Sequence, residues 1–142
     1  MTHIHLFLNS IQKQKLGQSK ILESYGDVSA GIVDEINAHQ APLIHLHWVS
    51  NLLSIEDIGR INKPIIWTLH DMWPFSGSEH YTHDDAFFYQ HPSQVHPNDN
   101  RSIQTFKQKY KSWQNQKFTL VSPSHWLAEY AKRSILFSNS NI

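Results

Sequence analysis

Polar residues, several of them histidines, follow three short apolar runs in this sequence. The run at residues 65–69 leads into His70 and Asp71, and an earlier run carries His45 and His47. An imidazole has an unperturbed pKa of about 6.5, so it can exchange a proton near neutral pH or hydrogen-bond to a sugar hydroxyl or a phosphate oxygen. Asp71 could orient such a ring or cap the turn that follows. These residue types predict a crevice for a sugar- or phosphate-type ligand.

The third apolar run, at residues 118–121, is followed by Ser122, Ser124 and His125. Ser124 is a typical N-cap residue, and the first free amides of the helix behind it could meet an anion. In an open parallel sheet, ligands bind at the carboxyl ends of the strands, where the loops diverge. We therefore expect all three polar sets to line one crevice. His125 is expected to be structural or exposed, and His45 could be either a ligand or a hydrogen-bonded core residue.

A second histidine cluster lies at residues 80–85, with the sequence HYTHDD. Imidazole nitrogens and carboxylate oxygens suit zinc or manganese. With the histidines at the strand ends, the cluster keeps a metal-dependent hydrolase open as an alternative function. Its spacing matches no established metal motif, so a solvated polar loop is the favoured interpretation. The aromatic residues from Trp73 to Tyr89 are expected to pack back on the sheet.

The composition excludes several classes of protein. Lys plus Arg and Asp plus Glu each count 12 in 142 residues, so no basic excess is available to bind nucleic acid. There is no cysteine for disulfides or thiolate metal sites, whereas the 11 histidines are unusually many. No apolar run approaches the roughly 20 residues that span a bilayer, and no signal peptide is recognisable, so we expect a soluble, cytoplasmic chain. No Gly-rich phosphate loop, Walker pattern or nucleophile elbow occurs.

A single α/β domain is predicted by the order of the patterned segments. A strand, a short helix and a second strand require a parallel crossover, so a buried parallel sheet is expected. A loop without periodicity covers residues 73–100, and loops of that length are usually functional or disordered. The expected strands are residues 43–48, 65–69 and 118–121, with another apolar run within residues 1–9; the expected helices are residues 28–39, 54–61, 103–113 and 126–135.

Each predicted helix has an apolar face at helical spacing. Ser54 and Asp57 have the spacing of a capping box at the start of the second helix. Asp99, Asn100 or Ser102 could cap the third. The expected buried faces are Ile32, Val33 and Ile36 in the first helix, Ile58 and Ile61 in the second, Ile103, Phe106, Tyr110 and Trp113 in the third, and Trp126, Leu127, Tyr130, Ala131 and Ile135 in the last.

Several sequence blocks, taken together, carry a family resemblance. They are LIHLHW at residues 43–48, KPIIWTLHDMWPFSG at 63–77, HY at 80–81, SPSHWLAE at 122–129 and SILF at 134–137. In this order and spacing they resemble the N-terminal half of bacterial glycosyltransferases of family 4. They are most similar to the subgroup that builds capsular, exopolysaccharide or colanic-acid glycans. The match covers residues 40–137.

The resemblance implies the acceptor-side, Rossmann-like domain of a two-domain GT-B glycosyltransferase. Such enzymes move a sugar, with retention, from a nucleotide-sugar donor to a glycan or lipid-linked acceptor, and they need no cofactor or metal. His70 would be the catalytic residue beside the transferred sugar. By the same resemblance, the substrate-binding residues are His47, Asp71, Trp73, His80, Tyr81, Ser122 and Ser124.

The chain departs from the family pattern in three places. The family's first strand and Gly-rich loop are not recognisable before residue 40, and residues 78–98 lack the cysteines usual in this subgroup. The donor-binding domain that the resemblance implies is not among residues 1–142. We therefore expect a fragment that works with a separate donor domain. Its expected place is the inner face of the membrane, with peripheral membrane association. A non-catalytic remnant is a further alternative.

Overall fold

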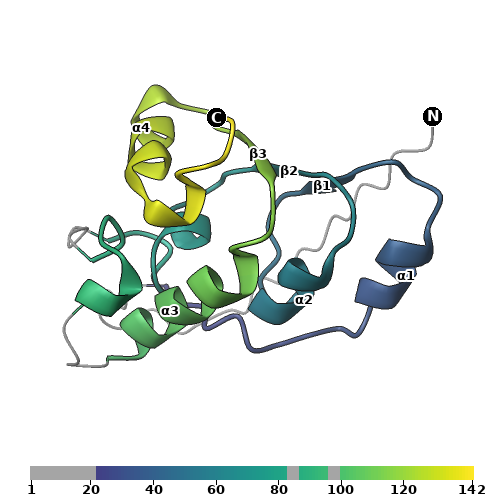
Figure 1. The fold of residues 1–142 in the computed structure, drawn as a ribbon, viewed down its shortest axis with the longest axis horizontal. Coiled ribbons are helices and arrows are strands. Elements are labelled where there is room, and N and C mark those ends of the chain that lie inside the picture. The colour runs from purple at the N-terminus through teal and green to yellow at the C-terminus, as the bar shows by residue number, and fades with distance from the viewer. Residues whose placement is uncertain (1–21, 83–86, 96–99) are drawn as a thin grey trace.

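The computed structural model describes residues 22–82, 87–95 and 100–142, and the strand expected within residues 1–9 lies outside them. Figure 1 shows α2 and α3 below the short strands and α4 to one side. Three short 3-10 helices interrupt the loops, two of them between residues 73 and 100. The strands are β1 (Ile44–Leu46), β2 (Ile65–Thr68) and β3 (Phe118–Val121); the helices are α1 (Val33–Ala38), α2 (Ile55–Arg60), α3 (Arg101–Trp113) and α4 (His125–Arg133); the 3-10 helices are η1 (Trp73–Phe75), η2 (Pro92–Gln94) and η3 (Ile135–Phe137).

The three strands form one parallel sheet in the order β1-β2-β3. Leu46 pairs with Trp67 and Trp67 with Leu120, so apolar residues of all three strands stand in register on one face. Helix α2 connects β1 to β2, and α3 lies between β2 and β3 in the chain. The predicted α/β class and the parallel βαβ unit are confirmed.

The prediction of a buried sheet is wrong for one of its two faces. Along every strand, buried residues alternate with half-buried or exposed ones. On the second face, His45 and Thr68 are half-buried and Val121 is 45% exposed. One reason lies in the strands themselves, which place His45, Thr68 and Thr119 among the residues of this face, as one-sided sheets do. In the described part of the chain this face is therefore partly open.

The apolar face of the sheet packs on α3, which in turn packs on α2. The indole centroids of Trp67 and Trp113 lie 5.6 Å apart, and Phe118 lies 5.8 Å from each of them. The Nε1 of Trp113 donates to the carbonyl oxygen of Ile55 at 2.8 Å, which joins the two helices. A core of aromatic rings thus holds β2 and β3 in place and determines where their carboxyl ends lie.

The predicted caps are present in the structure. Ser54 and Asp57 form a reciprocal capping box at the start of α2. Asn100, one of the three expected candidates, caps α3 through the backbone N–H of Ile103, and Ser124 caps α4. Short helices depend on such caps, because the first N–H groups of a helix have no partner inside it.

The buried face of α3 differs from the predicted one. Phe106 and Trp113 are buried as expected, but Ile103 and Tyr110 are only half-buried. The centre of the buried face is Lys109, whose side chain is completely buried. The helix therefore turns Lys109 toward the interior in place of Ile103 and Tyr110, which the apolar pattern did not indicate.

The last helix buries a narrower face than expected. Leu127 and Ala131 are buried, Tyr130 is half-buried, and Trp126 is 52% exposed. Ile135 lies beyond the end of α4, in η3. The predicted face of α4 is thus confirmed only at its centre.

Gly59 lies where α2 and α3 come closest. A Cβ built on it would be 2.5 Å from the carbonyl oxygen of Ser112. Alanine normally stabilises a helix relative to glycine by about 0.5–1 kcal/mol. Here the two helices would have to separate, so we expect Gly59→Ala to lower the free energy of unfolding by about 1–3 kcal/mol, as overpacking does. Denaturant titration would measure it against Gln104→Ala on the exposed side of α3; equal stability of the two variants would contradict this packing.

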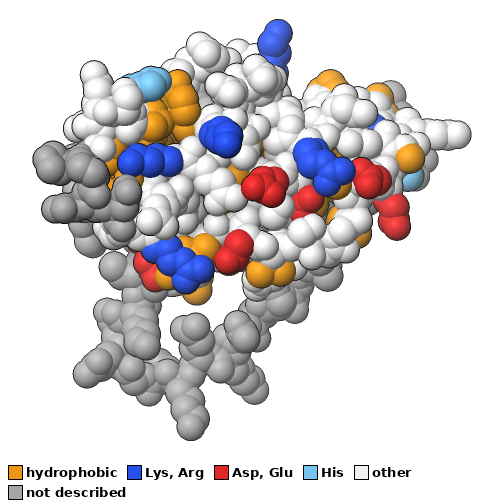
Figure 2. All heavy atoms as spheres, turned by 60° about the horizontal axis from the view of Figure 1, so that its bottom comes forward, with side chains coloured by type: hydrophobic (Ala, Val, Ile, Leu, Met, Phe, Trp, Pro, Cys, Tyr) orange, Lys and Arg blue, Asp and Glu red, His pale blue; other side chains and the backbone are white. Residues whose placement is uncertain are grey.

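The surface of the described residues carries mixed charges. On the face shown in Figure 2, Lys and Arg side chains are interspersed with Asp and Glu rather than gathered by sign. This distribution agrees with the formal net charge of zero. None of the described helices has the length and apolar character needed to cross a membrane.

Candidate functional site

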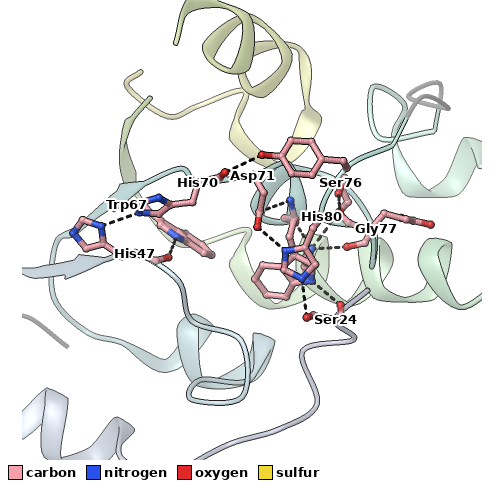
Figure 3. A network of polar contacts seen from close by, with 12 residues as sticks. Ser24, His47, Trp67, His70, Asp71, Ser76, Gly77 and His80 are labelled. Atoms are coloured by element: carbon pink, nitrogen blue, oxygen red, sulfur yellow. Dashed lines mark hydrogen bonds and ion pairs between the residues drawn. The ribbon is translucent and has the colours of Figure 1, made fainter. Parts of the chain in front are cut away.

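His70 is exposed just beyond the end of β2, and it meets His47, which follows β1. The Nδ1 of His47 lies 3.0 Å from the Nε2 of His70, a hydrogen bond between two imidazoles (Figure 3). The two residues come together because β1 and β2 are parallel neighbours whose carboxyl ends point the same way. The structure therefore places two of the predicted site residues side by side.

The hydrogen bond between the two rings assigns opposite roles to the two facing nitrogens. One of the facing nitrogens must donate and the other accept, so at least one ring of the pair is neutral when the bond is made. If His47 donates, a neutral His70 presents an N–H at its other nitrogen; if His70 donates, it presents a lone pair there. His70 can thus offer a ligand either a donor or an acceptor.

His45 extends this histidine pair along the open face of the sheet. Its Nε2 lies 2.8 Å from the Oγ1 of Thr68, and its ring centroid is 4.4 Å from that of His47. The expected placement of His45 and His47 on one side is confirmed. His45 fits the hydrogen-bonded alternative, since it is half-buried and bonded to the neighbouring strand.

Asp71 points inward, whereas His70 points outward. Its Oδ1 accepts the backbone N–H of Trp73 at 2.9 Å, which caps the turn into η1. Its Oδ2 lies 2.5 Å from the Nδ1 of His80. The expected cap is therefore present, but the ring that Asp71 contacts is that of His80 rather than that of a histidine at a strand end.

His80 is almost completely buried, at 2% exposure, between two indoles. Trp48 stacks on its ring at a centroid distance of 4.6 Å and an angle of 13° between the planes, and Trp73 lies on it at 6.4 Å. The Nε2 of His80 lies 2.8 Å from the hydroxyl of Ser24 (Figure 3). Asp71, Trp73 and His80 thus form a buried group, hereafter called the floor, in the loop that follows His70.

Tyr81 is the predicted site residue that reaches the surface beside His70. It is 57% exposed, and its hydroxyl donates to the carbonyl oxygen of His70 at 3.2 Å. Ser122 and Ser124 belong to the neighbouring strand end, since the N–H of Leu69 donates to the carbonyl of Val121 at 2.8 Å. Ser122 donates to the backbone oxygen of Ser124 at 2.9 Å, which shapes the turn before α4. His125 is exposed, as expected.

Lys109 of α3 supports the loop that links Asp71 to His80. Its Nζ donates to the carbonyl oxygens of Trp73, Ser76 and Gly77, and it lies 3.8 Å from the centroid of the Trp73 ring. Burial lowers the pKa of this lysine well below its usual value, while the charges of Asp71 and Glu79 oppose that shift. The side chain fits this place because its terminal nitrogen meets three converging carbonyl oxygens.

Several residues of the site were missed in the sequence. The burial of Lys109 could have been predicted from the sequence. Lys109 lies three residues after Phe106 and four before Trp113, so all three share one face of the helix, and that face is buried. The roles of Ser24 and Trp48 could not have been predicted, since their contacts to His80 span more than 30 residues. No local pattern encodes such contacts.

The described residues hold no group of three or more His, Asp or Glu side chains that could bind a metal ion. His83, Asp84 and Asp85 of the second histidine cluster lie outside the described residues. His80, the first member of that cluster, is bonded to Asp71 and Ser24 instead.

No protein-family model, curated protein or solved structure matches the chain.

Proposed function

We propose that the chain is the acceptor-side half of a retaining glycosyltransferase, and that His70 contacts the sugar being transferred from a nucleotide-sugar donor. The proposal draws on the sequence blocks of the family resemblance, which include the residues at the end of each strand. The observation that carries it is the exposed imidazole of His70 at the end of β2, held by His47 at 3.0 Å. The acceptor is a glycan or a lipid-linked glycan.

The chemistry around His70 suits a sugar better than a phosphate. The neighbouring groups are the imidazole of His47 and the exposed phenol of Tyr81. Both groups form hydrogen bonds, and their flat faces can pack on a sugar ring. A phosphate site would instead be expected to use arginine or lysine.

The buried residues of the floor have an indirect role in this proposal. Asp71 and His80 close the loop after β2, and the backbone N–H of Met72 donates to the carbonyl of His80 at 2.9 Å. Lys109 holds the middle of the same loop. This support keeps His70 in one position relative to His47, and a pre-positioned group is what catalysis by proximity requires.

Binding to the chain alone tests the acceptor half of the proposal. In NMR titrations with capsular or lipid-linked oligosaccharides, we expect the imidazole signals of His47 and His70 and the ring signals of Tyr81 to shift. The signals of His125, which is exposed on α4, serve as the internal control and should stay unchanged. Absence of any shift at saturating oligosaccharide would contradict an acceptor site here.

Transfer itself is tested after adding a nucleotide-sugar-binding domain of the same family as a separate chain. With labelled UDP- or GDP-sugars and a glycan acceptor, incorporation of label is expected only when both chains are present. If no combination of donor, acceptor and added domain gives incorporation of label, the proposed reaction is wrong. That result would favour the alternative that the chain is a non-catalytic remnant.

A further inference from the structure

Ser24, His80 and Asp71 form a continuous hydrogen-bonded row. The hydroxyl oxygen of Ser24 lies 2.8 Å from the Nε2 of His80, and the Nδ1 of the same ring lies 2.5 Å from the Oδ2 of Asp71 (Figure 3). A nucleophile bonded to a base, with the base oriented by a carboxylate, is the arrangement that activates serine for acyl transfer.

The carboxylate determines which nitrogen of His80 can act as the base. Asp71 accepts at Nδ1, so that nitrogen carries the hydrogen and the lone pair of Nε2 points at Ser24. The second oxygen of Asp71 is held by the N–H of Trp73 at 2.9 Å. The ring itself is fixed between Trp48 and Trp73. His80 therefore has one orientation and one tautomer suited to removing the proton of the serine hydroxyl.

The backbone of Ser24 is held from both sides. Its N–H donates to the carbonyl of Ser78 at 2.8 Å, and its carbonyl accepts the Nε1 of Trp73 at 2.6 Å. A side chain on a backbone fixed in this way needs little reorganisation before it reacts.

Ser24 is the member of the row nearest to solvent, and the Nε2 of His80, which must reach the leaving alcohol and the attacking water, faces its hydroxyl. Ser24 is half-buried, whereas Asp71 and His80 are buried. The backbone N–H groups of Tyr25 and Gly26, which follow it, donate to no residue among those described. Such N–H groups next to a nucleophile are the usual donors to the oxyanion that forms in acyl transfer.

We propose that Ser24 is the nucleophile of an esterase-type site that takes small acyl esters, with His80 as general base and Asp71 as the residue that orients it. The Oγ of Ser24 attacks the ester carbonyl carbon as its proton passes to the Nε2 of His80. The bond between the carbonyl carbon and the alcohol oxygen then breaks, and His80 protonates the leaving alcohol. Water, deprotonated by His80, hydrolyses the acyl-serine to a carboxylic acid and regenerates the hydroxyl.

This site can be tested separately from the proposed sugar transfer, although Asp71 and His80 also close the loop after β2. It uses neither His70 nor His47, and it needs neither a nucleotide-sugar nor a second domain. Its failure would therefore leave the proposed transferase untouched, and failure of sugar transfer would leave this site untouched.

Labelling of the full chain with a fluorophosphonate tests the inference. The probe forms a covalent bond to an activated serine with loss of fluoride, and intact mass with peptide mapping locates the label. We expect one label per chain, on Ser24, with none in Ser24→Ala. Labelling of Asp71→Asn should be slower by about 100-fold or more, because the amide no longer holds the imidazole in the required tautomer.

Ser78→Ala is the matched control for loss of a nearby serine. Ser78 lies in the segment that pairs with Ser24, but its hydroxyl donates to Glu23 at 3.3 Å rather than to His80. It should label at the wild-type rate. Release of p-nitrophenol from p-nitrophenyl acetate, with a burst of one equivalent, gives a second measurement. A wild-type chain that labels no faster than Ser24→Ala, or that labels at another residue, overturns the proposal.

Discussion

Replacing His70 with alanine is expected to reduce sugar transfer by about 100-fold or more in the assembly of this chain with a donor-binding domain. A positioned acid, base or hydrogen-bond donor typically contributes a factor of about 10²–10⁴ to the rate. His70 is exposed, so its removal leaves no cavity and the thermal unfolding midpoint should be unchanged. Initial rates of label transfer measure the effect, and circular dichroism measures the fold.

His125→Ala provides the matched control for the His70 variant. His125 is also an exposed histidine, but it lies in the first turn of α4 and takes no part in the histidine pair. It should transfer sugar at nearly the wild-type rate. Equal rates for the wild type and His70→Ala would remove His70 from the mechanism.

Replacing Lys109 with methionine is expected to destabilise the fold by about 2–5 kcal/mol at neutral pH. Methionine fills a similar volume, but the carbonyls of Trp73, Ser76 and Gly77 lose the donor that they share. Each buried carbonyl left without a partner costs about 1–3 kcal/mol, and some of that cost is relieved by local rearrangement. Urea or guanidinium titrations of the two proteins measure the difference.

The same substitution should change how stability depends on pH. Because burial lowers the pKa of Lys109 in the folded protein, the unfolded chain binds more protons than the folded one between that pKa and the unfolded value of about 10.4. The wild-type contribution of this residue therefore becomes more favourable as pH rises through that window. Lys109→Met should lack this rise, as seen by comparing denaturant midpoints from pH 7 to pH 10.

Lys111→Met separates these effects from the loss of any lysine. Lys111 lies on the same helix but is exposed, so it should leave stability within about 0.5 kcal/mol and keep the wild-type pH dependence. A Lys109→Met protein that is as stable as Lys111→Met would show that the three carbonyls do not depend on the ammonium.

Most elements of the fold could be predicted because they are local. β3 occupies the predicted residues, and β2 ends one residue before the predicted boundary at Leu69. The capping box at Ser54 and the N-cap at Ser124 were also predicted, since each joins residues only three apart. Burial of the sheet was predicted less well, because apolar runs as short as these do not show whether both faces are covered.

The candidate site also has features that could be predicted from the sequence and features that could not. The exposed His70 and its place at a strand end followed from the sequence, because parallel strands bring their carboxyl ends to one edge. That Asp71 turns inward to His80 while His70 turns outward did not follow. Adjacent residues after a strand point to opposite sides, and the pattern does not say which side is the interior. Asp71, Trp73 and His80 as substrate contacts stay a prediction, with buried side chains.

The sequence by itself determined the order of strands and helices, the caps, and the presence of a histidine at the end of β2, since these depend on residues close together in the chain. Only the tertiary structure decided the partners of those residues. Ser24 meets His80 across 56 positions and Lys109 reaches the carbonyl of Gly77 across 32, and both contacts exist because packing of the core brings distant segments together. Burial makes such polar groups find partners, but which partners they find depends on the whole fold.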